Sequence, residues 1–132
     1  MFQVIESVAL QKIRVLIADD HRLFADALAA ILATDERIEV VGKAQDGQEA
    51  VELATSTQPN VVLMDIAMPR LDGLEAAKRI KEGSDSTAVL MLTGSDLPSD
   101  VARAREAGVS GYVTKDRIAS ELIDSIVSAI EK

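Results

Sequence analysis

Residues 61–73, VVLMDIAMPRLDG, are the stretch that decides the fold of this chain. Its four apolar residues, Val61 to Met64, are long enough to form a buried strand. We expect the strand to stop at Asp65, because a carboxylate is costly inside an apolar sheet. Pro69 prevents a simple continuation of strand or helix, and the capping-box sequence of residues 72–75, DGLE, starts a helix. The stretch therefore predicts a lone acid at the carboxyl end of a buried strand, where open α/β sheets bind ligands.

Outward from this stretch, strand and helix patterns alternate along the whole chain. Short apolar runs predict strands over 13–18, 38–41, 61–64, 88–92 and 110–114. Apolar residues at helical spacing, capping boxes and closing glycines predict helices over 23–32, from 46, from 72, over 95–108 and over 118–130. Five strands alternating with five helices predict an α/β fold with a parallel sheet, right-handed crossovers and helices on both faces.

Composition limits the classes of function that this chain can have. A formal net charge of −8 over 132 residues disfavours direct binding to nucleic acid or to an anionic membrane. The chain has no cysteine, which excludes disulfides, and its N-terminus lacks the features of a signal peptide, so we expect a cytoplasmic location. Residues 1–12 fit neither period and are expected to form an N-terminal extension to one domain over 13–131.

Four of the predicted strands end in polar residues: Asp19-Asp20, Asp65, Thr93 and Lys115. Each has an ordinary explanation, since aspartate often caps helices, threonine is common in strands and lysine is usually solvated. Together they are informative, because the carboxyl ends of parallel strands lie along one rim of the sheet. The second strand ends without such a residue, which is consistent with an edge position away from the site.

The chemistry of these residue types points to phosphoryl transfer. Three neighbouring carboxylates resist joint ionisation, and Mg²⁺ relieves that conflict because it binds a few carboxylates together with water and phosphate oxygens. A carboxylate can also act as a nucleophile, while Lys115 and Thr93 supply a cation and a hydroxyl for the phosphate oxygens. The rim is therefore predicted to be a Mg²⁺-dependent acyl-phosphate site. His21, the only histidine, is interpreted as the first exposed residue of the next helix.

At these residues the chain resembles the receiver domain of bacterial two-component response regulators. The resemblance covers residues 13–130 and is carried by Asp19-Asp20, by MDIAMPRLDG at 64–73, by LTG at 92–94 and by GYVTK at 111–115. The stretches LIADDHRLFADAL, IEVVGKAQDGQEAVELA and GVSGYVTKD resemble the NarL/FixJ type, whose second domain is a DNA-binding helix-turn-helix. The resemblance implies a flavodoxin-like, doubly wound sheet with strand order 2-1-3-4-5.

The resemblance also implies a role for each site residue. Asp65 matches the phosphoacceptor, and a sensor histidine kinase would be the phosphoryl donor. Asp20 matches the direct Mg²⁺ ligand, Asp19 the ligand that acts through water, and the backbone carbonyl of Ala67 the third protein ligand. Lys115 and Thr93 match the phosphate contacts. Tyr112, together with Thr93, matches the switch pair, which would alter the surface formed by residues 95–130.

Two features depart from the family pattern. Asp116 stands where many members have a proline after a cis peptide bond, and since a non-proline cis bond costs about 2.5–4 kcal/mol we expect a trans bond here. The sequence also stops at Lys132 without a helix-turn-helix, so we expect either an excised domain or a stand-alone receiver.

The functional expectation is a signalling switch that catalyses only its own phosphorylation and dephosphorylation. Its output would be transcription through a helix-turn-helix domain, the only route to DNA, with a homodimer as a further expectation on phosphorylation. Two alternatives stay open: a stand-alone receiver acting through protein contacts, and an aspartate-nucleophile phosphatase. The second would need a general acid at the position of Ala67. The sequence identifies neither the kinase nor the regulated process.

Overall fold

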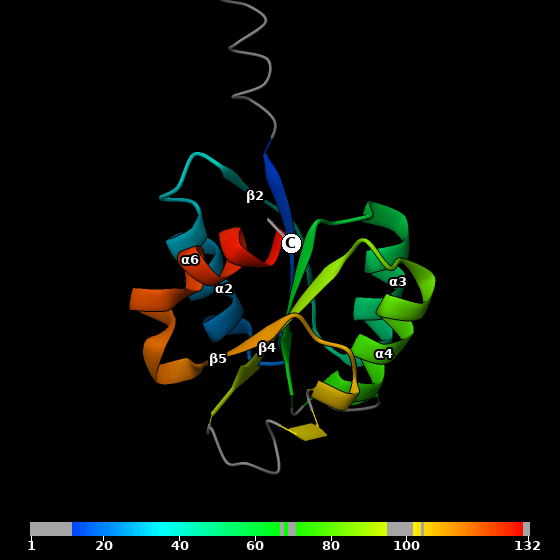
Figure 1. Cartoon of the computed structure of the whole chain (residues 1–132). Coiled ribbons are helices and arrows are strands. Elements are labelled where there is room, and N and C mark those ends of the chain that lie inside the picture. The colour runs from blue at the N-terminus through cyan, green and yellow to red at the C-terminus, as the bar shows by residue number, and fades with distance from the viewer. Residues whose placement is uncertain (1–11, 67, 69–70, 95–101, 104, 131–132) are drawn as a thin grey trace, which may run out of the picture.

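The computed structural model describes residues 12–66, 68, 71–94, 102–103 and 105–130. Its centre is a five-stranded parallel sheet in the order β2-β1-β3-β4-β5 (Figure 1). The strands are β1 Ile13–Ala18, β2 Ile38–Ala44, β3 Val61–Asp65, β4 Ala88–Thr93 and β5 Gly111–Thr114. Both the predicted doubly wound fold and its strand order are confirmed, and β2 occupies an edge of the sheet as expected.

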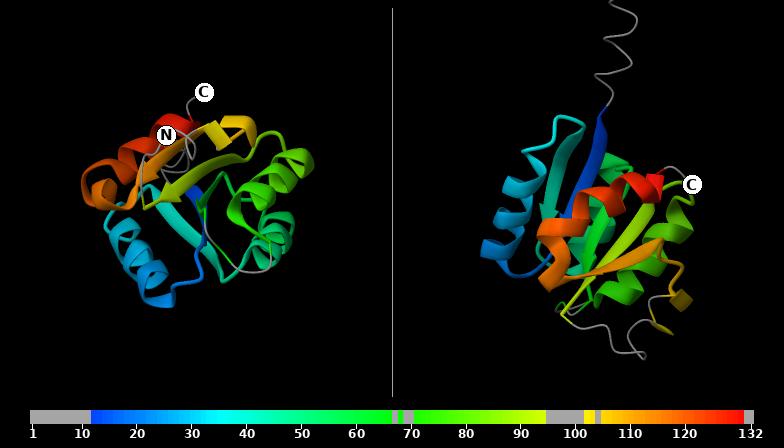
Figure 2. Two further views of the ribbon diagram at one scale, coloured as in Figure 1. Left: turned by 90° about the horizontal axis from the view of Figure 1, so that it is seen from below. Right: turned by 60° about the vertical axis from the view of Figure 1, so that its left-hand side comes forward.

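Helices cover both faces of this sheet. They are α2 Arg22–Leu32, α3 Gly47–Thr57, α4 Gly73–Gly83 and α6 Ile118–Ile130, with a 3₁₀ turn, η1, at Lys115–Arg117. Figures 1 and 2 show α2 and α6 on one face and α3 and α4 on the other. The helix expected over 95–108 lies largely outside the described residues, although 102–103 and 105–106 are helical. No described helix has both the length and the hydropathy needed to cross a membrane.

Alternation along the strands divides the core into two parts. In β1, Leu16 and Ala18 belong to the core under α3 and α4, whereas Val15 and Ile17 belong to the core under α2 and α6. The central strand β3 is buried along its whole length, as its continuous apolar run predicts. Because successive side chains of a strand point to opposite faces, this parity also determines which helices the residues at the strand ends can meet.

The boundaries of four strands differ from those predicted, including β3, which includes Asp65 instead of ending at Met64. β2 continues to Ala44 instead of ending at residue 41, with a shift of its pairing with β1 between Val15 and Leu16. The prediction failed because Gly42 and Lys43 interrupt the apolar run, which a bulged edge strand tolerates. β4 includes Thr93, and β5 begins at Gly111 instead of residue 110.

Two capping aspartates start the helices next to the functional rim. Asp46 and Asp72 are the N-caps of α3 and α4, and their carboxylates accept the backbone N–H of Glu49 and Glu75, at 2.8 and 2.9 Å. Gly73 then packs so closely beneath the rim that an added Cβ would lie 2.0 Å from the carbonyl oxygen of Asp65. The start of α4 is thus fixed directly against the end of β3.

Candidate phosphoacceptor site

The structure brings Asp19, Asp20, Asp65, Thr93 and Lys115 together at the carboxyl end of the sheet. Strand register explains the meeting: Ala18 pairs with Met64, so Asp19 and Asp65 are each the next residue along neighbouring strands. On the other side Thr93 pairs with Thr114, which places Lys115 one residue beyond that pair. Asp19 and Asp65 share the parity of Ile17 and Leu63, the residues that face α2 and α6.

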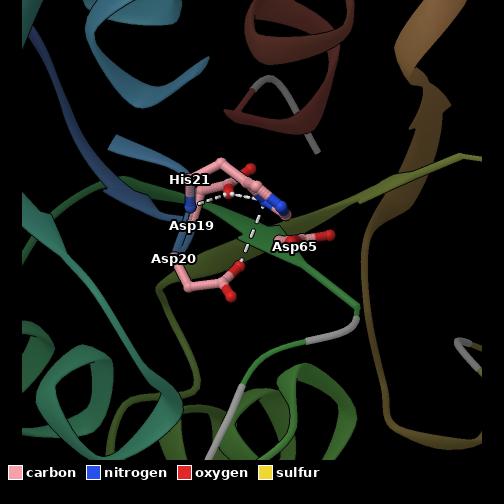
Figure 3. Close-up of side chains that lie close together, drawn as sticks. All are labelled: Asp19, Asp20, His21 and Asp65. Atoms are coloured by element: carbon pink, nitrogen blue, oxygen red, sulfur yellow. Dashed lines mark hydrogen bonds and ion pairs between the residues drawn. The ribbon is translucent and has the colours of Figure 1, made fainter. Parts of the chain in front are cut away.

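The carboxylates form a compact and largely buried cluster. Asp19 is 1% exposed and Asp65 is 4% exposed. Each of Asp19, Asp20, His21 and Asp65 offers a ligand atom, and these atoms all lie within 4.8 Å of one another (Figure 3). The like charges of these neighbouring acids repel one another, so the cluster needs positive charge nearby.

Lys115 supplies part of that positive charge. Its Nζ lies 3.5 Å from Asp19 Oδ2 and 3.5 Å from Asp65 Oδ1, and its side chain is only 27% exposed. The ammonium therefore stands between the two buried acids without a short hydrogen bond to either. The peptide bond to Asp116 is trans, as expected, since the described residues include no cis peptide bond.

One buried oxygen of this cluster has the Lys115 ammonium at 3.5 Å but no hydrogen bond from the described residues. Asp19 Oδ1 accepts the backbone N–H of His21 at 2.8 Å, whereas Asp19 Oδ2 is buried and accepts no hydrogen bond from the described residues. An unsatisfied buried carboxylate oxygen is costly. The carboxylates of Asp19, Asp20 and Asp65 together offer an oxygen donor set that fits a hard divalent cation such as Mg²⁺.

The remaining predicted site residues have different surroundings. Thr93 ends β4 and is 6% exposed, whereas Tyr112 on β5 is 42% exposed. Ala67, whose carbonyl was predicted to bind the cation, lies outside the described residues. The rim thus holds the acids, Thr93 and Lys115 together, while Tyr112 lies on the surface of β5.

Two residues of the site were not anticipated from the sequence. His21 is exposed, as predicted, but it is the N-cap before α2 instead of its first residue, and its Nδ1 lies 3.2 Å from both Asp19 Oδ1 and Asp20 Oδ1. Phe24, interpreted only as an apolar residue of the helix, lies under the Lys115 ammonium at 4.5 Å from ring centroid to Nζ. Adjacency to the acid pair could have indicated His21, whereas no sequence signal links Phe24 to Lys115.

Comparison with known proteins identifies the family of this chain. The response regulator receiver domain family matches residues 15–127, which include every residue of the cluster. The chain belongs to this family. Among curated relatives, the transcriptional regulatory protein DegU of Brevibacillus brevis is 39% identical over 121 residues, which are 92% of this chain and 51% of DegU. The chain thus spans about half the length of that relative.

Solved structures give the same result for the fold. The receiver domain of the putative response regulator NarL from Mycobacterium tuberculosis superposes with a TM-score of 0.87 and 32% identity, over 92% of this chain and 98% of that one. A chain of the CheX–CheY–BeF₃–Mg²⁺ complex from Borrelia burgdorferi superposes with a TM-score of 0.83 and 25% identity, over 90% of both chains. The flavodoxin-like receiver fold is therefore shared with these proteins.

Proposed function

We propose that this receiver domain is a phosphorylation-dependent switch in which Asp65 accepts a phosphoryl group from a sensor histidine kinase. The observation that carries the proposal is the placement of Asp65. Its buried carboxylate ends the central strand β3, with the Lys115 ammonium 3.5 Å from Oδ1 and two further acids in the same cluster. Asp72, by contrast, is an exposed residue whose carboxylate caps the start of α4. We therefore assign the phosphoacceptor role to Asp65 and not to Asp72.

In the proposed reaction, a carboxylate oxygen of Asp65 attacks the phosphorus of the kinase phosphohistidine. A P–O bond forms, the P–N bond breaks, and its electron pair returns to the imidazole nitrogen, giving an aspartyl phosphate and free histidine. Lys115 donates N–H groups to the phosphoryl oxygens, and Thr93 contributes its hydroxyl from the end of β4. The protein would thus catalyse its own modification instead of turning over a separate substrate.

We further propose that Asp19, Asp20 and Asp65 hold Mg²⁺, with the Ala67 carbonyl as a ligand outside the described residues. The support is the oxygen donor set and the unsatisfied Asp19 Oδ2. A bound Mg²⁺ would supply charge neutralisation between carboxylate and phosphoryl oxygens. The three aspartate side chains would determine the position of the ion at the rim.

The proposed output is a change in the surface of β5, α6 and the segment over 95–108. Tyr112 is exposed there and lines a groove of about 290 Å³ between β5 and α6, with Ser110, Glu121 and Asp124 among its other lining residues. DegU is a transcriptional regulatory protein of about twice this length. We therefore propose a helix-turn-helix output domain as the route to DNA and a homodimer on phosphorylation.

Intact mass spectrometry after incubation with acetyl phosphate and Mg²⁺ tests the phosphoacceptor. The wild-type chain should gain the mass of one phosphate, and Asp65→Asn should gain none. Asp85→Asn makes the same charge change at an exposed turn, so it should be phosphorylated like the wild type. Full phosphorylation of Asp65→Asn would show that another residue is the nucleophile.

The same incubation separates the switch from its alternatives. A receiver should release inorganic phosphate slowly, in step with the decay of its phosphorylated mass. Rapid multiple turnover would instead favour an aspartate-nucleophile phosphatase. A chain that gains no mass in any form would favour an interaction module that works without phosphorylation.

A further inference from the structure

In the part of the chain that the structure describes, three groups lie close to the ammonium of Lys115. Two are carboxylates, Asp19 and Asp65, each 3.5 Å from Nζ. The third is the aromatic ring of Phe24, whose centroid lies 4.5 Å from Nζ. Because 3.5 Å is at the long end of the hydrogen-bonding range, neither carboxylate fixes the position of the ammonium by itself.

Phe24 reaches this position from the helix layer that covers this face of the sheet. It lies in the first turn of α2 and is half-buried, packed against the core that α2 and α6 cover. Val113 of β5 belongs to the same core, and Lys115 has the parity of Val113 along the chain. The lysine stem and the Phe24 ring therefore approach each other from the end of β5 and the start of α2.

An aromatic face holds a cation differently from a carboxylate. Its attraction acts on the whole ammonium, within about 6 Å of the ring centroid, and needs no N–H donor. All three N–H donors of a lysine can then point to oxygen atoms. A carboxylate in the same place would take up one donor and would add negative charge to a site that must accept a phosphoryl group.

We propose that Phe24 is a positioning residue for phosphoryl transfer. Its ring holds Lys115 Nζ close to Asp19 and Asp65, so that the N–H donors of Lys115 point at Asp65 and at the incoming phosphoryl oxygens. This inference rests on the proposed function for the transfer step, and on geometry alone for the contact. It also explains why an apolar residue of α2 stands beside a cluster of charged groups.

The contact itself can be measured without phosphorylation. A ring below Nζ should shift the Lys115 ε-methylene proton resonances upfield through its ring current, which two-dimensional NMR of the full chain detects. Phe24→Leu should remove this shift, whereas Phe24→Tyr, which keeps the ring, should retain it. A Lys115 resonance that is the same in wild type and Phe24→Leu would overturn the proposal.

The role in transfer is tested by phosphorylation kinetics with acetyl phosphate at saturating Mg²⁺. Phe24→Leu should lower the maximal rate constant about fivefold, in the range of a partly desolvated cation–π contact, while Phe24→Tyr stays within about twofold of wild type. The concentration of acetyl phosphate at half-maximal rate should change little, because Phe24 is placed to orient Lys115 and not to bind the donor.

Leu28→Val separates positioning from packing. Leu28 is buried one turn further along α2, so its shortening should lower the urea midpoint of unfolding, as Phe24→Leu does, yet leave the phosphorylation rate unchanged. Equal slowing by Leu28→Val and Phe24→Leu would overturn the positioning role. Absence of phosphorylation in the wild type would instead refute the proposed function, and the NMR comparison would still decide whether Phe24 holds Lys115.

Discussion

The two ends of the parallel sheet differ in how fully their polar groups are hydrogen-bonded. At the amino end, Asn60 Oδ1 accepts the backbone N–H of Arg14 at 2.8 Å, and the buried Thr87 hydroxyl lies 3.2 Å from the Pro59 carbonyl oxygen. At the carboxyl end, two buried aspartates lie in one cluster and Asp19 Oδ2 accepts no hydrogen bond from the described residues. The amino end stabilises the fold, whereas the carboxyl end holds buried acids close together, with the Lys115 ammonium 3.5 Å from two of them.

The largest expected effect comes from disturbing the support of the carboxyl end. Gly73→Ala would place a Cβ 2.0 Å from the Asp65 carbonyl oxygen and 2.9 Å from its carbon. We expect a loss of about 3 kcal/mol in the free energy of unfolding, together with slower phosphorylation, because backbone atoms must shift. Urea unfolding and intact mass after acetyl phosphate treatment measure the two effects.

Gly83→Ala is the matched control, in the same helix. An added Cβ there meets nothing within 4 Å, so the variant should be as stable as the wild type or up to about 1 kcal/mol more stable. Similar losses in Gly73→Ala and Gly83→Ala would show that the effect does not come from contact with Asp65.

A smaller effect is expected at the amino end. Thr87→Val keeps the shape of a side chain that is 3% exposed but removes its hydroxyl, which lies near the Pro59 carbonyl and 3.1 Å from Ser84 Oγ. We expect a loss of about 1 kcal/mol in urea unfolding and no change in phosphorylation. Thr55→Val, on the exposed face of α3, should change stability by less than about 0.5 kcal/mol. Slower phosphorylation of Thr87→Val would contradict the claim that the amino end serves stability and the carboxyl end serves phosphorylation.

The smallest effect concerns a surface ion pair beyond the amino end, and it depends on pH. The Arg37 side chain donates to the Asp35 carboxylate at 3.0 and 2.7 Å, and this hydrogen bonding lowers the pKa of Asp35 from 3.8 to about 2. A lowered folded-state pKa adds stability above pH 4 that is lost as the pH falls towards 2.

The difference in urea midpoint between wild type and Asp35→Asn should therefore be constant from pH 7 to about 4. It should narrow between pH 4 and 2. A difference that persists unchanged at pH 2 would show that Asp35 contributes through packing or turn geometry and not through its charge.

Much of this organisation could be predicted from the sequence, for physical reasons that particular residues show. The apolar run before Asp65 indicated a buried strand, and the alternation of strands with helices indicated parallel pairing. From these two features the polar residues at the strand ends could be placed along one rim of the sheet. The end of β2 was missed because Gly42 and Lys43 look like a turn when the pairing partner is unknown. The contact between Phe24 and Lys115 was missed because it joins residues far apart in the chain, whereas His21 contacts its neighbours Asp19 and Asp20 and could have been anticipated.

The central claim is that the carboxyl end stores an electrostatic cost that a divalent cation relieves, with Asp65 at its centre. Urea unfolding of wild type and Asp65→Asn, with and without Mg²⁺, tests it most directly. Without Mg²⁺, Asp65→Asn should be more stable than wild type by about 1 kcal/mol, since one of several close carboxylates is neutralised. Asp85→Asn, an exposed control with the same charge change, should not share this gain.

Addition of Mg²⁺ at ten times its dissociation constant should stabilise the wild type by about 1.4 kcal/mol and Asp65→Asn by much less. The account is contradicted if Mg²⁺ leaves the wild-type unfolding curve unchanged, or if it stabilises Asp65→Asn as much as the wild type.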